Sequence, residues 1–213
     1  MRAERNWRVG LIGFGLGGAA FHAPVIAATP GLVIAAIVTS NASRREQAVR
    51  MFPAASVLAN TAEMFAGATD LDIAVIASPN RTHIPLAVDA LAAGLHVVVD
   101  KPFAASISDA VRAIDAARER KKLLTVYQNR RWDGDFLTLR QLVAAGRLGR
   151  VLRFESRFSR WRPVPEPGWR LLEAPEEAGG LLFDIGTHLI DLRDRDPRVR
   201  RARSPPPWPQ RRR

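Results

Sequence analysis

Three glycines near the start of the chain have a spacing suited to binding phosphate. Gly13, Gly15 and Gly18 form the pattern Gly-x-Gly-x-x-Gly directly after the apolar run Val9–Ile12. The first glycine permits a tight turn, the second lets backbone approach a pyrophosphate, and the third lets the next helix pack closely. The free N–H groups at the start of that helix favour an anion. Because such glycines also occur in turns that bind nothing, the surrounding elements must support the interpretation.

A second group of residues suited to chemistry lies further along the chain. Asp184, His188 and Asp191 are spaced i, i+4 and i+7, so they share a face if the segment is helical. A carboxylate one turn from an imidazole can orient the ring and raise its basicity, which suits general acid–base catalysis. Spacing alone slightly favours a plain ion pair on a helix face. A metal site would need more ligands than this segment offers, so we expect no metal.

Alternating apolar runs and helical segments surround the glycine pattern. The runs that predict buried strands are Val9–Ile12, Leu32–Val38, Leu71–Ala77, Leu95–Val99 and Leu123–Tyr127. Predicted helices run to Ala28, over Arg44–Met51, over Ala62–Ala66 after a Thr61 cap, to Ala93 and, from a cap at Ser106 or Ser108, to Arg120. Successive units of this kind predict an α/β fold, with a doubly wound parallel sheet covered by helices on both faces.

Polar and glycine-rich segments follow the predicted strands, where parallel sheets bind ligands. These segments are Gly13–Gly18 with Phe14, Thr39–Arg45, Ser78–His83 with Pro79 and Asn80, Asp100–Pro102 with Lys101, and Gln128–Trp132. Their convergence on one edge of the sheet is the strongest structural argument for a real site.

The segment after the second strand indicates which dinucleotide binds. An NAD site usually has Asp or Glu there for the ribose 2′-hydroxyl, but this chain has Thr39, Ser40, Arg44 and Arg45 and no acid. Hydroxyls and arginines suit a 2′-phosphate, so we prefer NADP over NAD. The alternative is that Ser43 only caps the following helix and both arginines are solvated.

Composition excludes several classes of protein. The chain has 213 residues, no cysteine and a net charge of +11, of which residues 193–213 contribute +7 through nine arginines and two aspartates. Any electrostatic case for nucleic acid therefore applies to that tail alone, and we rank it last because Trp208 is its sole aromatic residue. Without disulfides, a membrane-length apolar run or a leader-like segment, we expect a cytoplasmic protein with no membrane partner.

The character of the sequence changes after Tyr127. We expect an amphipathic helix over Asp133–Ala145, a strand over Val151–Phe158 and a loop from Trp161 to Trp169 rich in proline and tryptophan. The expected domains are a dinucleotide-binding Rossmann domain over residues 1–127, a partial α+β substrate domain over 128–192, and a disordered Arg/Pro-rich tail over 193–213.

Taken together, these motifs resemble the Gfo/Idh/MocA oxidoreductases, the group of glucose–fructose oxidoreductase and inositol dehydrogenase. The resemblance covers residues 7 to about 192 and rests on five segments. They are Gly13-x-Gly15-x-x-Gly18, Ser78-Pro79-Asn80-x-x-His83, Gly94-x-His96-Val97, Asp100-Lys101-Pro102, and Gly179-Gly180-x-x-x-Asp184-x-x-x-His188-x-x-Asp191. The segments Phe21–Pro24 and Asn129–Asp133 are similar to the branch that contains NADP-dependent scyllo-inositol dehydrogenases.

The resemblance implies roles for individual residues. Lys101 would position and polarise the reacting oxygen, His188 would exchange the hydroxyl proton, and Asp184 would orient both His188 and the substrate. Asn80 and His83 would lie near the cofactor. Arg131, Trp132 and Asp133 would line the side that holds a sugar or polyol. Asp100 departs from the family, which usually has Glu before the Lys-Pro pair, and we expect a small effect.

The end of the sequence also departs from the family pattern. Members continue with a largely antiparallel sheet that forms the substrate wall and often the interface of a homo-oligomer, whereas here the apolar pattern stops at Leu192. We therefore expect the tail to be the product of a shifted reading frame or a premature end. We also expect weak turnover, and we do not carry the family's homo-oligomer over to this chain. The competing function is a non-catalytic nucleotide-binding protein that senses a ligand or binds a partner.

Overall fold

The computed structural model describes residues 5–159, 161, 163–164 and 174–195. The chain divides into two compact units. The first unit contains Met1–Tyr127 and Glu166–Asp184, and the second contains Gln128–Pro165 and Ile185–Arg213. The tail predicted to be disordered lies almost entirely outside the described residues, as does most of the loop predicted from Trp161 to Trp169.

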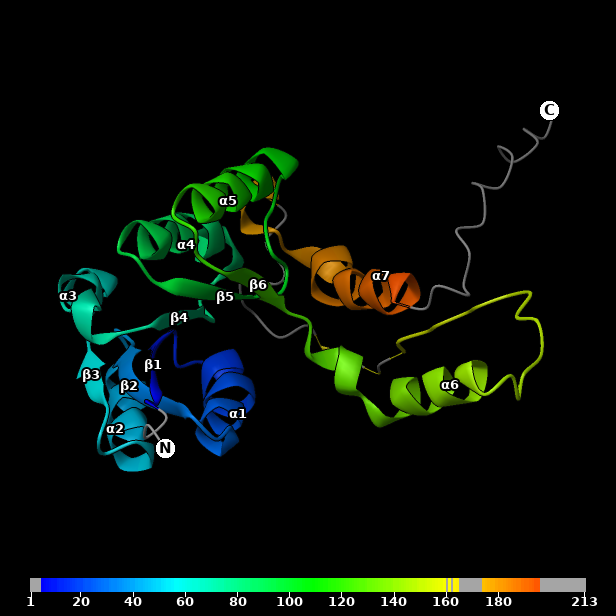
Figure 1. Ribbon diagram of the computed structural model, residues 1–213, viewed down its shortest axis with the longest axis horizontal. Coiled ribbons are helices and arrows are strands. Elements are labelled where there is room, and N and C mark those ends of the chain that lie inside the picture. The colour runs from blue at the N-terminus through cyan, green and yellow to red at the C-terminus, as the bar shows by residue number, and fades with distance from the viewer. Residues whose placement is uncertain (1–4, 160, 162, 165–173, 196–213) are drawn as a thin grey trace. The chain divides into compact units, whose positions relative to one another are not determined.

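The first unit is built on a six-stranded parallel sheet, as predicted from the alternating apolar runs (Figure 1). Its strands lie in the order β3-β2-β1-β4-β5-β6, which reverses direction between β1 and β4. Such a reversal opens a crevice at the carboxyl ends of the strands, where doubly wound sheets bind ligands. The strands are β1 (Trp7–Ile12), β2 (Leu32–Val38), β3 (Ser56–Leu58), β4 (Ile73–Ile76), β5 (His96–Asp100) and β6 (Leu124–Tyr127).

Helices connect the strands and cover the sheet. They are the π-helix η1 (Gly17–His22), α1 (Ala23–Ala28), α2 (Ala42–Met51), α3 (Thr61–Ala66), η2 (Ala68–Asp70), η3 (Asn80–Thr82), α4 (His83–Ala92), α5 (Ile107–Glu119) and η6 (Pro175–Glu177). Within the described part of the chain, no helix combines the length and apolar character needed to cross a membrane.

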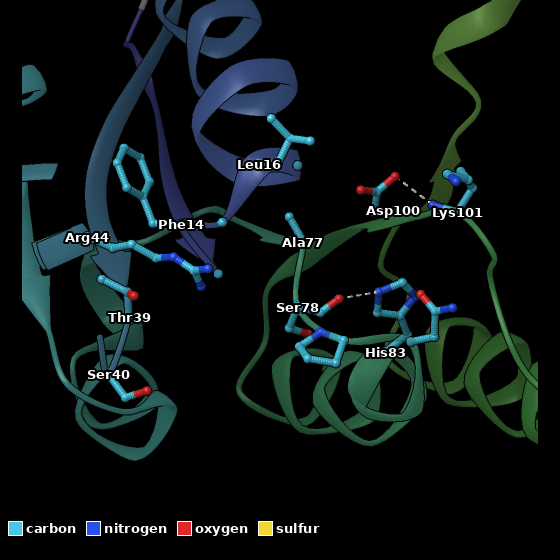
Figure 2. Close-up of a pocket in the computed structure, with 15 residues that line it drawn as sticks. Phe14, Leu16, Thr39, Ser40, Arg44, Ala77, Ser78, His83, Asp100 and Lys101 are labelled. Atoms are coloured by element: carbon cyan, nitrogen blue, oxygen red, sulfur yellow. Dashed lines mark hydrogen bonds between the residues drawn. The ribbon is translucent and has the colours of Figure 1, made fainter. Parts of the chain in front are cut away.

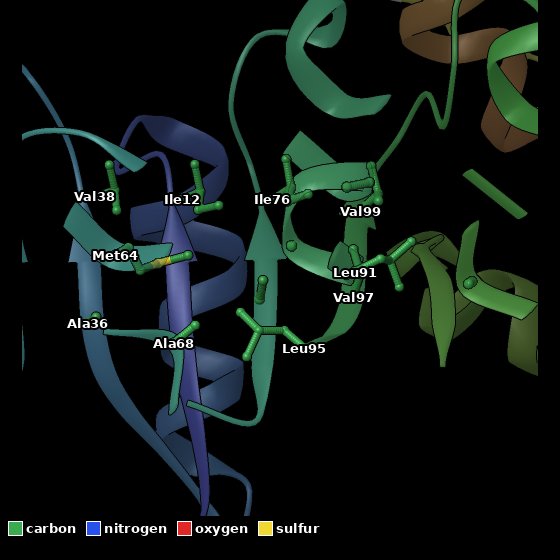
Figure 3. Close-up of a cluster of buried hydrophobic side chains, with 14 residues drawn as sticks. Ile12, Ala36, Val38, Met64, Ala68, Ile76, Leu91, Leu95, Val97 and Val99 are labelled. Atoms are coloured by element: carbon green, nitrogen blue, oxygen red, sulfur yellow. The ribbon is translucent and has the colours of Figure 1, made fainter. Parts of the chain in front are cut away.

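Two layers of apolar side chains hold the helices to the sheet. Because successive strand residues point to opposite faces, Leu11 joins a cluster under α1 and α2 while Ile12 joins one under α3, α4 and α5. Figure 3 shows the second cluster, in which Leu91 of α4 and the strand residue Val99 are buried. The continuous apolar character of β2 follows from this arrangement, since both of its faces are covered.

The structure decides which residues cap three of the helices. Asn41 caps α2 by accepting a hydrogen bond from the Arg44 N–H at 3.0 Å, so the alternative in which Ser43 caps this helix is wrong. Asn60, rather than Thr61, caps α3. Ser106 caps α5, which settles the choice between Ser106 and Ser108. The strand β3, of three residues, was not predicted from the sequence.

The second unit contains η4 (Asn129–Trp132), α6 (Gly134–Ala144) and α7 (Thr187–Asp194). The π-helix η7 (Leu182–Gly186) contains the boundary between the two units. The predicted strand over Val151–Phe158 is wrong, because these residues have no regular secondary structure. A strand is held by hydrogen bonds to a neighbouring strand, and the second unit has no strand among its described residues.

Candidate active site

The glycine turn after β1 needs two of its glycines for its own packing. Gly13 has φ +97°, and a Cβ there would lie 2.5 Å from the Ala77 carbonyl oxygen. A Cβ on Gly18 would overlap the Gly13 carbonyl oxygen. At Gly15 the nearest atom to a Cβ is Nη1 of Arg44, at 3.6 Å. Gly15 therefore keeps its backbone accessible beside an arginine, as the approach of a phosphate requires.

The segment after β2 brings hydroxyl groups and one arginine to the same turn. Thr39 is buried, Ser40 is exposed, and both line a cavity with Arg44. Arg44 lies in the first turn of α2, with its guanidinium group beside Gly15. Arg45 is exposed and is not among the residues that line the cavity. Of the two arginines predicted to bind a 2′-phosphate, the structure brings Arg44 to the cavity.

His83 connects two strand-end segments through its ring. Its Nδ1 lies 2.8 Å from the Pro102 carbonyl oxygen and its Nε2 lies 3.0 Å from the Ser78 carbonyl oxygen. Burial lowers the pKa of His83, although the two carbonyl groups partly oppose that effect. A neutral imidazole donates one hydrogen bond only, so one of these two contacts lacks a proton. His83 lines the cavity, and both of its nitrogens face backbone.

Lys101 is held at the end of β5 by a residue far away in the sequence. Its ammonium Nζ donates to Oδ1 of Asp184 at 2.8 Å and to the Asp184 carbonyl oxygen at 2.9 Å. Both residues belong to the first unit. Asn80, predicted to lie near the cofactor, is buried and donates to the Ala178 carbonyl oxygen at 2.9 Å. Ala178, directly after η6, thus contacts the β4 end of the cavity, and Asp184 of η7 (Leu182–Gly186) holds the β5 end.

Asp100 is paired with His22, a residue outside the predicted site. Oδ2 of Asp100 lies 3.4 Å from Nε2 of His22, and Oδ1 accepts the Lys101 N–H at 2.7 Å. Burial alone would raise the pKa of the Asp100 carboxyl, but His22 and the Lys101 N–H outweigh it and hold that pKa below its usual range. The His22 ring packs on Tyr127, with centroids 4.2 Å apart. Burial and Asp100 raise the pKa of Tyr127.

These strand ends enclose one cavity of about 500 Å³ in the first unit, shown in Figure 2. All the predicted cofactor residues except Gly18 and Arg45 line it. The lining consists of Gly13, Phe14, Gly15, Leu16, Gly17, Thr39, Ser40, Arg44, Ala77, Ser78, Pro79, Asn80, His83, Asp100 and Lys101. Arg44, Thr39 and Ser40 lie at one end, and Asp100 and Lys101 lie at the other. The cavity therefore offers phosphate-binding groups and an ammonium group at opposite ends.

The predicted substrate residues of the second unit are largely engaged in ion pairs. Arg131 donates through Nε and Nη2 to the two carboxylate oxygens of Asp191, at 2.7 and 2.6 Å. These hydrogen bonds raise the pKa of Arg131. Asp133 accepts from Arg130 at 2.8 Å. Trp132 is 74% exposed. Arg131 thus joins η4 to α7, whereas the indole of Trp132 presents a free aromatic face to solvent.

His188 is buried in α7 and lines a smaller cavity of about 270 Å³ within the second unit. Of the three residues predicted to share a helix face, Asp184 binds Lys101 in the first unit, while Asp191 binds Arg131 in the second. The described residues contain no cluster of three or more His, Cys, Asp or Glu side chains arranged to hold a metal ion.

Two neighbours of the cavity could not be found from spacing. His22 lies in the segment Phe21–Pro24, and only the family resemblance indicated that segment. Tyr127 ends β6 and donates from its hydroxyl group to the Phe21 carbonyl oxygen at 3.1 Å. Its position at a strand end was the available signal.

A parallel sheet with this strand order and a glycine turn after β1 defines the first unit as a dinucleotide-binding α/β domain of the Rossmann type. Comparison with known families agrees with this assignment and also identifies the family. The profile of the oxidoreductase family with an NAD-binding Rossmann fold matches residues 7–128, and the Gfo/Idh/MocA C-terminal domain matches residues 136–194. The chain belongs to the Gfo/Idh/MocA oxidoreductase family, which confirms the resemblance.

Individual relatives show the extent of the similarity. The chain is 45% identical to the uncharacterized oxidoreductase YdgJ of Escherichia coli, over 87% of this chain and 52% of that one. It is 35% identical to the scyllo-inositol 2-dehydrogenase (NADP⁺) IolW of Bacillus subtilis, over 86% and 50%. The structure of YPO2259 from Yersinia pestis has a TM-score of 0.78 at 45% identity, over 88% and 51%. The chain spans about half the length of the curated relatives it matches.

Proposed function

We propose that the first unit binds NADP(H) and that this chain takes part in hydride transfer between the nicotinamide and a polyol, sugar or related hydroxy or keto compound. The observation that carries the proposal is the single cavity that gathers the glycine turn, Arg44 and Lys101. Gly15 leaves the backbone accessible there, so the donor groups fit a pyrophosphate.

The preference for NADP rests on the end of β2. No acid follows this strand to accept a ribose 2′-hydroxyl, and Arg44 faces the glycine turn with Thr39 and Ser40 beside it. A guanidinium group binds phosphate through two parallel N–H donors, which a ribose hydroxyl cannot match. The name of the relative IolW, an NADP⁺ enzyme, supports the same preference.

Bound nicotinamide would supply the hydride acceptor or donor. Lys101 would donate a hydrogen bond from Nζ to the reacting oxygen of the substrate, and Asp184 holds that ammonium group in place. An imidazole nitrogen of His188 would take the hydroxyl proton in oxidation and return it in reduction. The exposed ring of Trp132 would pack on a sugar or polyol ring, and Arg131 would act by holding α7 through Asp191.

Titration of the purified chain with NADPH and NADH tests the cofactor assignment. We expect NADPH to bind at least about tenfold more tightly, since a charge-assisted hydrogen bond contributes about 1.5–3 kcal/mol. Arg44→Ala should remove most of that preference. Arg45→Ala should remove less, because Arg45 does not line the cavity. Arg50→Ala is the matched control, an exposed arginine on the same helix. Equal affinities in the unaltered chain would contradict the NADP preference.

Turnover of a panel of polyols and sugars with each cofactor tests the reaction. We expect activity with at least one polyol or sugar, and loss of that activity in His188→Ala with NADPH binding retained. Tight NADPH binding without turnover of any compound would instead favour the competing function, a nucleotide-binding sensor or partner-binding protein.

A further inference from the structure

A buried acid–imidazole pair lies at the Lys101 end of the cavity. His22, in η1 directly after the glycine turn, is 3% exposed, and its Nε2 lies 3.4 Å from Oδ2 of Asp100. This separation is longer than a well-formed hydrogen bond, so the interaction is chiefly electrostatic. Asp100 lines the cavity and His22 does not. His22 can therefore influence a ligand through the charge of Asp100 without contacting that ligand.

The contacts of the other ionisable groups around the pair fix the charge of each group near neutral pH. Directly after β5, the Lys101 ammonium is paired with Asp184 from η7. On α4, burial lowers the pKa of His83, which keeps that ring neutral near pH 7. On β6, the pKa of Tyr127 is raised, so its hydroxyl group stays protonated. Since histidine is the side chain that normally changes charge between about pH 5 and pH 8, His22 is the candidate to alter the charge of this region near neutral pH.

The proposed function places the nicotinamide near this pair. With the pyrophosphate at the glycine turn and the 2′-phosphate at Arg44, the other half of the dinucleotide must extend toward Asp100 and Lys101 at the opposite end (Figure 2). The oxidised nicotinamide ring carries a positive charge that the reduced ring lacks. An ionised Asp100 therefore attracts the oxidised form more strongly.

We propose that the His22–Asp100 pair couples the choice between oxidised and reduced cofactor to the protonation of His22, an inference that rests on the proposed function. When His22 is neutral, the charge of Asp100 favours NADP⁺. When His22 takes up a proton, its positive charge cancels much of the field of Asp100, and the preference shifts toward NADPH. By linkage, His22 must be easier to protonate with NADPH bound than with NADP⁺ bound. His22 is thus a positioning residue that acts through Asp100.

Dissociation constants of NADP⁺ and NADPH for the 213-residue chain, measured calorimetrically from about pH 6 to about pH 8.5, test the coupling. We expect the ratio of the NADP⁺ constant to the NADPH constant to rise about fivefold or more as the pH falls, the lower range of coupling between linked sites. Taking the ratio removes the titration of the 2′-phosphate near about pH 6, because both cofactors carry that group.

Variants assign the effect to the pair. His22→Gln and Asp100→Asn should each flatten the pH dependence of the ratio. His96→Gln is the matched control, because His96 lies at the start of β5 and accepts the Leu123 N–H at 2.9 Å away from the cavity lining. Proton NMR of the His22 ring in the unaltered chain needs no variant. The ring should titrate at a higher pH with NADPH bound than with NADP⁺ bound.

The possible failures are distinguishable. Binding of both cofactors with a ratio that does not change with pH, or an identical slope in His22→Gln, would overturn the coupling and leave the proposed function standing. If the variants do not fold, the NMR measurement on the unaltered chain still decides. Identical titrations of the His22 ring with the two cofactors would overturn the coupling and leave the proposed function standing. If neither cofactor binds, the coupling and the proposed function both fail.

Discussion

Replacing Gly15 with alanine separates the two roles that glycines have in the turn after β1. Gly15 and Gly18 belong to one sequence pattern, yet their surroundings differ. A Cβ at Gly15 would lie 3.6 Å from its nearest neighbour, Nη1 of Arg44, which is an ordinary van der Waals distance. A Cβ at Gly18 would overlap the Gly13 carbonyl oxygen. We therefore expect Gly15→Ala to impair binding and Gly18→Ala to impair folding.

The expected magnitudes follow from these contacts. Gly15→Ala should leave the melting temperature unchanged or slightly raised. A compatible alanine lowers the conformational entropy of the unfolded chain, which stabilises the folded state by about 0.4–1 kcal/mol. If the methyl group displaces one backbone hydrogen bond to the pyrophosphate, the loss of about 1.5–3 kcal/mol raises the NADPH dissociation constant about tenfold to a hundredfold. Gly18→Ala should cost about 1–3 kcal/mol or more through overpacking. That cost lowers the melting temperature by roughly 2–12 °C.

Thermal unfolding and NADPH titration on the same preparations give both readouts. Gly67→Ala is the control, since the nearest atoms to a Cβ at Gly67 are backbone oxygens 3.9 Å away. It should leave NADPH binding unchanged and, for the same reason as Gly15→Ala, leave the melting temperature unchanged or slightly raised. A Gly15→Ala protein that binds NADPH as tightly as the unaltered chain would show that no phosphate approaches this backbone, and the assignment of the cavity would fail.

Three further changes test other contacts. Lys101→Met should lower turnover at least about a hundredfold while NADPH still binds, since the ammonium acts at the reacting oxygen; a fully active variant would refute that role. Burial lowers the pKa of His83 in the folded chain. When the pH falls below the ordinary pKa of histidine, the unfolded chain therefore binds a proton that the folded chain does not, which favours unfolding. The melting temperature should fall from about pH 7.5 toward about pH 5.5, and it should fall less steeply in His83→Gln. Arg131→Gln should lower the melting temperature by about 2–4 °C, the equivalent of about 1 kcal/mol, and exchanging Arg131 with Asp191 should restore part of the loss.

The sheet could be predicted because a parallel strand that is covered on both faces has a continuous run of apolar residues. Leu32–Val38 is apolar throughout, and the structure has β2 over the same residues. The strand β3 has no such apolar run, since it has three residues and begins with Ser56. Caps were ambiguous for a different reason. Asn41 and Ser43 are both good capping residues two positions apart, and only the backbone geometry decides between them.

The cavity could be predicted to the same degree, because the carboxyl ends of parallel strands meet at one edge. Thr39, Ser78 and Lys101 were identified by their positions after strands and line a common cavity. His22 was not, because its contact with Asp100 joins a helix to a strand end 78 residues further on. No periodicity relates two such residues. The domain boundaries and the origin of the tail stay predictions.

The position of Asp184 includes a contact that spacing along one helix could not reveal. Spacing associates Asp184 with His188, and the structure adds that the Asp184 carboxylate holds the ammonium group of Lys101, 83 residues earlier in the chain. Lys101 and Asp184 both belong to the first unit, whereas His188 belongs to the second. The groups proposed to hold the cofactor and the reacting oxygen thus come from one unit, and the group proposed to move the proton comes from the other. Cofactor affinity should therefore tolerate changes in the second unit that abolish turnover, and a loss of both together would contradict this division of roles.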